Sequence, residues 1–233
     1  MPAAEQPRRM SYEGVLNKTT LLLTIAVISA VLTWLAGPSM WMLIGAPAAI
    51  AALVLGLVLS LKKEPSVVLT LLFAVAEGAV AGALSAVLNV QTQGIVAYAL
   101  IATVVTLVTV LALFRSGKLR MTGKMKQILA VATLAYLAFV VVNFALTLFG
   151  VMPGMGIRDI EVMGIPLGLP IGILAVLLAA ACLVADFDNT KKGVEAGVES
   201  KYEWTASFSL LATLVWMYVE FLRIFHYISA LAE

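Results

Sequence analysis

Seven apolar stretches, each about 20 residues long, constrain the fold of this chain more than any other feature. A helix needs about 20 mainly apolar residues to cross the hydrocarbon core of a bilayer. The sequence therefore predicts an all-α membrane protein, a seven-transmembrane helix bundle. The expected spans are residues 19–36, 40–61, 66–90, 94–114, 127–151, 164–187 and 205–224.

Composition supports a membrane protein and excludes several functions. Hydrophobic residues make up 62% of the chain and charged residues only 12%, whereas a soluble domain has about 25% charged residues. A net charge of +2 is too small to indicate a nucleic-acid partner. The single cysteine, Cys182, excludes an internal disulfide and any metal site built from several cysteines. No tightly bound cofactor is expected, and the lipid bilayer is the expected surrounding.

Basic residues alternate between the connecting segments and predict the orientation. The N-terminal tail and the segments after the second, fourth and sixth spans are basic, whereas the other segments between spans contain only Arg158. Because cytoplasmic loops carry an excess of Lys and Arg, we expect residues 1–18 to form a cytoplasmic tail. Residues 19–233 then form a single transmembrane domain. Seven crossings place the C-terminus outside; if the last span does not cross fully, the C-terminus is cytoplasmic, as Arg223 and His226 would favour.

Three carboxylates lie within or at the end of apolar stretches: Glu77, Asp186 and Glu220. An ionised carboxylate near a bilayer centre costs roughly 2.5–3.5 kcal/mol on insertion scales. A chain that carries three such groups is expected to use them for ions, for protons or to pair with one another. Transport is therefore the first functional hypothesis.

The surroundings of each acid leave alternatives open. Glu77 precedes Gly78 and Gly82, which let a neighbouring helix approach closely, so Glu77 is a candidate polar contact between helices. Asp186 and Asp188 lie about 200° apart on a helix, so one can face inward while the other faces water or nearby lysines. Glu220 lies on an apolar face, three residues before Arg223, which makes an ion pair within the helix an alternative to ion handling.

Catalytic motifs are missing from the sequence. There is no zinc-protease, serine-hydrolase or phosphate-binding pattern, and the only histidine, His226, follows the last apolar stretch. Asp186 and Glu220 could serve as an aspartyl pair in an intramembrane protease, but the usual G-x-G-D context is absent. We therefore expect a protein that is not an enzyme.

The ordered combination of these segments resembles the Bax inhibitor-1 family, in a bacterial branch. The resemblance is carried by Asp186-Phe187-Asp188, by the terminal segment from Trp216 to Phe225, by Ala76-Glu77-Gly78 with Gly82, and by Gly14 to Thr19. It covers essentially the whole chain. It implies a bundle with the last helix near the centre and a multi-pass location in the bacterial inner (plasma) membrane.

The resemblance also implies a pH-sensitive calcium leak. In the family, an acid late in the sixth span and one in the last span form a hydrogen-bonded pair, which corresponds here to Asp186 and Glu220, with Glu in place of the usual Asp. Two ionised acids about 4 Å apart repel by about 4 kcal/mol at an effective dielectric near 20, whereas a shared proton joins them. The expected gate is this pair, which also offers Ca²⁺ a weak site, with Glu77, Arg223 and Asp188 as supporting contacts.

Two alternatives to this hypothesis concern the partner of Glu220 and the function of the protein. Asp186 and Glu220 face each other only if the turn between their helices centres near residue 203, yet Gly193 and Gly197 favour an earlier turn. Otherwise Glu220 pairs with Arg223 or Glu77. The alternative function is a non-transporting membrane regulator that binds a membrane protease or a stress-response partner. A bundle of this size can work as a monomer.

Overall fold

Seven long helices form the bundle in the part of the chain that this computed structural model describes, residues 8–119 and 121–232. They are α1 (Tyr12–Leu35), α2 (Ala46–Leu61), α3 (Val67–Gln91), α4 (Ile95–Arg115), α5 (Gly123–Leu148), α6 (Gly168–Glu195) and α7 (Glu203–Ala232). Each is long and apolar enough to cross a membrane, α2 when it is counted from Trp41. The predicted all-α, seven-span fold is confirmed.

Short elements fill the connections between these helices. The single turns η1 (Pro38–Met40) and η2 (Trp41–Gly45) lead into α2. The segment between α5 and α6 contains η3 (Gly156–Asp159) and a hairpin of β1 (Glu161–Val162) and β2 (Ile165–Pro166). The turn η4 (Ser200–Tyr202) precedes α7.

Several helices extend beyond the apolar stretches that predicted them. The first helix begins at Tyr12 rather than at residue 19, because the Ser11 hydroxyl accepts the Gly14 N–H and caps its first turn. The sixth helix continues to Glu195 rather than ending at 187, so its last turns carry charged side chains beyond the apolar run. The expected tail of residues 1–18 is therefore partly helical, and its first seven residues lie outside the described chain.

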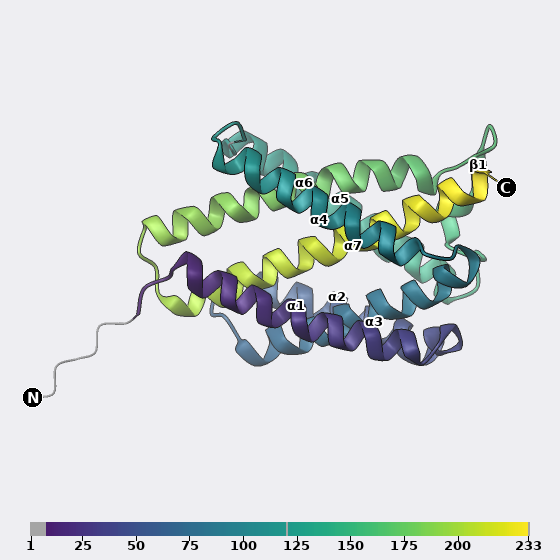
Figure 1. The fold of residues 1–233 in the computed structure, drawn as a ribbon, viewed down its shortest axis with the longest axis horizontal. Coiled ribbons are helices and arrows are strands. Elements are labelled where there is room, and N and C mark those ends of the chain that lie inside the picture. The colour runs from purple at the N-terminus through teal and green to yellow at the C-terminus, as the bar shows by residue number, and fades with distance from the viewer. Residues whose placement is uncertain (1–7, 120, 233) are drawn as a thin grey trace, which may run out of the picture.

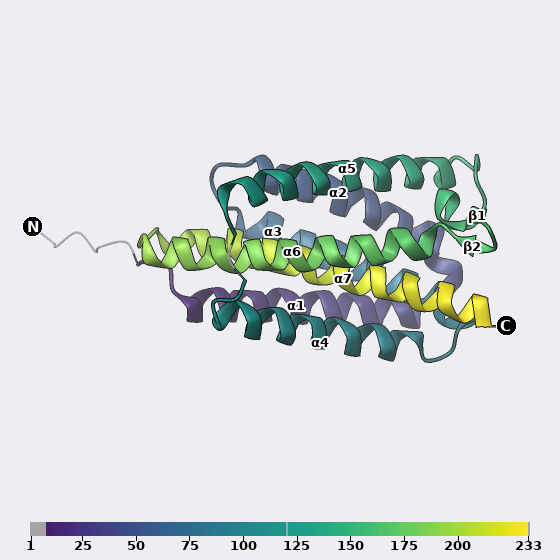
Figure 2. The same cartoon turned by 90° about the horizontal axis from the view of Figure 1, so that it is seen from above.

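The last helix, α7, lies at the centre of the bundle, as expected. It packs against α1, α3, α4 and α6, and these neighbours surround it in both views (Figures 1 and 2). Buried side chains recur along its length, including Leu211, Met217, Glu220 and Leu222. The fifth helix lies at the periphery against α6 and η3, with no buried residue.

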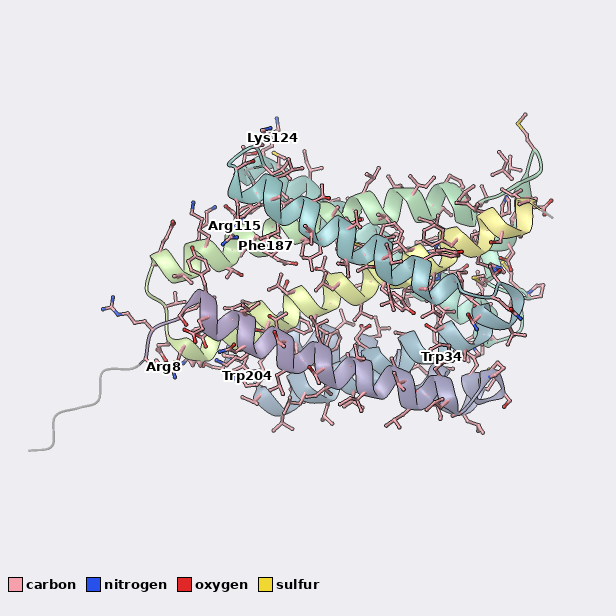
Figure 3. All side chains as sticks on the ribbon, viewed as in Figure 1. Arg8, Trp34, Arg115, Lys124, Phe187 and Trp204 are labelled. Atoms are coloured by element: carbon pink, nitrogen blue, oxygen red, sulfur yellow. The ribbon has the colours of Figure 1, made fainter. Side chains whose placement is uncertain are left out.

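The two ends of the bundle differ in charge. The basic end holds residues 8–11 and the connections after α2, α4 and α6, and Figure 3 shows Arg8, Arg115 and Lys124 at that end. Arg120, a basic residue in the connection after α4, lies outside the described residues. The opposite end holds the η3 and β1–β2 segment and the last turn of α7 (Figure 1). Since α7 runs from one end of the bundle to the other, it is long enough to cross fully.

Glycines on α3 bring α1 unusually close. A Cβ atom added at Gly78 would lie 2.2 Å from the carbonyl oxygen of Ala26, and one added at Gly82 would lie 2.1 Å from that of Ala30. These are backbone atoms of α1, which cannot turn away as a flexible side chain can. The small-xxx-small face next to Glu77 is thus a helix-packing face between α3 and α1.

Adding a methyl group to this face should destabilise the bundle. We expect Gly78→Ala and Gly82→Ala each to lower the free energy of unfolding by about 1–3 kcal/mol, the usual cost of overpacking. Gly123→Ala is the matched control, because a Cβ there meets nothing within 4 Å. Apparent melting temperatures in detergent measure the effect, and equal values for Gly78→Ala and Gly123→Ala would contradict the close packing.

Candidate functional site

Asp186 is held between α6 and α7 by two hydroxyl groups. Its carboxylate accepts hydrogen bonds from Ser209 Oγ at 2.5 Å and from Thr213 Oγ1 at 2.7 Å. The side chain is 9% exposed. Both donors lie on one face of α7, four residues apart, so a single helix face presents both hydroxyls to the acid.

A cavity of about 300 Å³ adjoins Asp186 and extends toward the basic end. Its lining includes polar side chains from α6 and α7: Asp186, Asn189, Thr190, Thr205 and Ser209. The Thr190 hydroxyl is buried and has no hydrogen-bond partner among the described residues. The cavity therefore combines a carboxylate with neutral oxygen atoms, the ligand type that Ca²⁺ prefers.

Glu220 is fully buried and binds two arginines and a tyrosine. Arg158 donates to both carboxylate oxygens, with Nη1–Oε2 and Nη2–Oε1 distances of 3.0 and 3.2 Å. Tyr136 Oη and Arg223 Nη1 each donate to Oε1 at 2.5 Å. Such charge-assisted bonds are the strongest hydrogen bonds that side chains make, and this carboxylate receives four.

Arg158 reaches Glu220 from the segment between α5 and α6. Asn143 on α5 fixes that segment, since its side chain accepts the Ile157 N–H at 2.8 Å and donates to the Met155 carbonyl at 3.0 Å. Arg158 is 2% exposed, and its guanidinium carbon lies 5.5 Å from the centre of the Phe139 ring. Burial by itself would lower the pKa of Arg158, but the Glu220 carboxylate and its hydrogen bonds hold that pKa above its ordinary value.

A second carboxylate accompanies Glu220 at the opposite end. Asp159, next to Arg158, accepts hydrogen bonds from Tyr227 Oη at 2.8 Å and from the Met155 N–H at 2.6 Å. Two carboxylates, Glu220 and Asp159, thus accompany two guanidinium groups, Arg158 and Arg223. A buried ionic group of this kind persists only when it is paired and hydrogen-bonded, as this one is.

Asp186 and Glu220 do not form the expected pair. Asp186 bonds to Ser209 and Thr213, while Glu220 lies two helical turns beyond Thr213, about 10 Å along α7, with other partners. The cause is the turn between the helices. Gly197 adopts φ +63° and the Val198 N–H bonds to the Gly193 carbonyl, which ends α6 before residue 203. The two carboxyls therefore cannot share a proton or one calcium ion.

Of the three predicted supporting contacts, only Arg223 binds one of the two acids. Arg223 pairs with Glu220, which confirms one of the open alternatives. Asp188 points away from Asp186 and pairs with Lys192 at 2.9 Å and Lys126 at 2.8 Å. Glu77 is partly buried on α3 and receives no hydrogen bond or ion pair from any described residue, so it supports neither acid directly.

Sequence reasoning missed Arg158, Tyr136, Ser209 and Thr213 as partners of the two acids. Arg158 carried a usable signal, because it is the only basic residue between spans on its side of the membrane. A tyrosine or a hydroxyl residue in an apolar helix gives no comparable signal. Within the described chain, no three His, Cys, Asp or Glu side chains gather as a metal site would require.

Comparison with known proteins gives the family. A family model described as Bax inhibitor 1 like matches residues 1–230, essentially the whole chain. The chain belongs to the Bax inhibitor 1 like family. No curated protein matches it. In this family member, the acids of α6 and α7 occupy two levels of the bundle, with hydroxyl partners at one level and arginine partners at the other.

Removing the Glu220 carboxylate should destabilise this Bax inhibitor 1 like protein. Glu220→Ala leaves two guanidinium groups near the bundle interior without their acceptor, so we expect a loss of about 3–5 kcal/mol of stability. Arg158→Gln should cost less, because Arg223 still neutralises Glu220.

The control for this prediction is Lys201→Gln, which breaks an exposed contact with Glu64 and should cost about 0–1 kcal/mol. Unfolding in detergent, followed by circular dichroism, ranks the three variants. If Glu220→Ala were as stable as Lys201→Gln, the ionic group would not stabilise this end of the bundle.

Proposed function

We propose that this protein is a pH-sensitive calcium leak channel or cation transporter of a bacterial plasma membrane, with a cytoplasmic N-terminus. One observation carries the proposal: a buried carboxylate, Asp186, adjoins a cavity that extends toward the basic end. A second, Glu220, lies further along the face of α7 that carries Ser209 and Thr213. Acids at two depths can receive a cation in succession. Membership of the family supports an ion-conducting role.

Asp186 is the proposed first station for the cation. Its carboxylate and the oxygens of Thr190 and Ser209 supply fewer ligands than the six to eight that Ca²⁺ prefers, so water must complete the shell. A site of this kind binds weakly, which suits passage rather than storage.

Glu220 is the proposed second station, and Arg158 blocks it. The guanidinium occupies both carboxylate oxygens, so a passing cation must displace it. We therefore assign the arrangement in Figures 1 and 2 to a closed state, in which the cavity lies toward the basic end and Arg158 blocks the path nearer the opposite end. Opening then requires movement of the η3 segment.

Protonation controls this pathway through each acid separately. A protonated Asp186 carries no charge and is a poor calcium ligand, whereas the ionised form attracts the cation. The flux should therefore rise as the pH rises. This mechanism replaces the shared proton, which the separation of the two acids rules out.

Asp186→Asn should reduce calcium flux into liposomes and flatten its dependence on pH, because an amide does not titrate. Purified protein, calcium-loaded medium and an internal fluorescent indicator provide the measurement over pH 5 to 8. Asp188→Asn is the matched control, since that acid lies two residues away and pairs with Lys126 and Lys192 instead. An unchanged pH profile for Asp186→Asn would exclude this acid from the mechanism.

Arg158→Gln should raise the flux about tenfold, because it removes a charge-assisted bond that holds the closed state. Arg158→Lys retains the positive charge without the two-pronged contact and should give an intermediate flux. The same liposome assay reports both. A flux lower than that of the unmodified protein in both variants would show that Arg158 does not close the path.

The alternative is a non-transporting regulator of a membrane protease or a stress response. The exposed α5 favours it, because this helix buries no residue within the bundle and could receive a partner helix. Such a regulator should give no flux in liposomes and should co-purify with a large partner. We propose a monomeric transporter rather than an enzyme, since each acid finds its partners within one chain. Cleavage of a substrate that depends on the acids would contradict this.

A further inference from the structure

Residues 8–11, here called the N-terminal strap, lie across the turn between α6 and α7. The Met10 N–H donates to the Val198 carbonyl at 2.8 Å, and the Ser200 N–H donates to the Arg8 carbonyl at 2.7 Å. Arg9 and Glu199 form the antiparallel bridge between these two bonds. The strap therefore joins the start of the chain to a turn almost 190 residues away in sequence.

Glu203 anchors the strap from the first turn of α7. Its carboxylate is 3% exposed and accepts the Ser11 N–H at 2.9 Å and the Ser11 hydroxyl at 3.2 Å. The Lys18 ammonium pairs with its other oxygen. Gly14 makes room for this group, because a Cβ there would overlap the Glu203 carboxylate at 2.2 Å. One buried acid thus holds both the strap and the start of α1.

Met10 lies where the strap meets the cavity beside Asp186. Its side chain is 6% exposed and lines that cavity together with Val198, Gly193 and Thr190. A Cβ added at Gly193 would lie 2.8 Å from the Met10 sulfur, so the side chain rests directly on α6. Releasing the strap would remove Met10 from the cavity wall.

We propose that the N-terminal strap is a lid on the part of the cavity that Thr190 and Asp186 line, closed by Met10 and latched by Glu203. The two backbone bonds and the Glu203 contacts are local, so they can break without unpacking the helices of the bundle. An open strap exposes Thr190 and the path to Asp186. The effect of the lid on ion flow rests on the proposed transport, whereas its effect on access to the cavity does not.

Access to the cavity tests the lid without any transport. In a protein with Cys182 replaced by Ala, Thr190→Cys places one thiol in the cavity beneath Met10. We expect a charged thiol reagent to label it slowly, and about tenfold faster when Glu203→Gln weakens the latch. Glu64→Gln, at an exposed contact of the same end, is the control and should leave the rate unchanged. Equal labelling rates with and without Glu203→Gln overturn the proposal.

A cross-link tests whether the lid regulates ion flow. Arg9→Cys with Glu199→Cys, in the same Cys182→Ala background, places two thiols across the bridge at about the spacing a disulfide requires. Oxidation should lower the calcium flux severalfold and reduction should restore it. Each single-cysteine variant, treated alike, is the control.

The outcomes separate the two proposals. Flux that is the same in oxidised and reduced protein overturns the lid as a regulator while leaving transport intact. No flux in any variant, with labelling that still responds to Glu203→Gln, supports the lid and contradicts the proposed function. Reversible loss of flux on oxidation, together with faster labelling in Glu203→Gln, supports both.

Discussion

The contact between Arg158 and Glu220 determines how one half of this bundle is assembled. A carboxylate with no exposure to solvent is tolerated only with fixed counter-charges. Here Arg223 supplies one from the same helix, and Arg158 supplies the other from a connecting segment rather than from a neighbouring helix. The requirement orders the segment between α5 and α6, with Asn143 and Asp159 holding its backbone. Tyr136 joins α5 to the same carboxylate. The peripheral α5 thus contacts the central α7 through this hydrogen bond and through stacking of the Tyr136 and Trp216 rings.

The turn before α7 determines where the two acids lie, because it sets the register of α6 against α7. A left-handed Gly197 ends α6 early and places Asp186 opposite Ser209 and Thr213. A turn several residues later would have brought the acid toward Glu220. The same turn provides the backbone groups that bind Arg8 and Met10. One glycine therefore separates the two acids and creates the edge on which the N-terminal strap lies.

The sequence was sufficient for the architecture but only partly for the site. The lengths of the apolar stretches predict all seven helices. The spacing of Gly78 and Gly82 predicts the face of α3 that packs against α1. Asp186 and Glu220 were recognised as buried acids, because charges in apolar runs stand out. Of their partners, the sequence indicates Arg223 but not Ser209, Thr213 or Arg158. Hydroxyl residues are common in such helices, and Arg158 is distant in sequence from Glu220. Helix register depends on the turn, and periodicity within each helix does not specify it.

The pairing of Arg158 with Glu220 also has a consequence for membrane voltage. If the η3 segment and α7 move together, the charges of Arg158 and Glu220 cancel, so the pair carries no net charge across the membrane. A motion that withdraws Arg158 alone carries one positive charge through part of the membrane field, which acts on it with at most about 2.3 kcal/mol per 100 mV. If the protein conducts ions as proposed, the steepness of current against voltage reports whether Arg158 moves alone or together with Glu220.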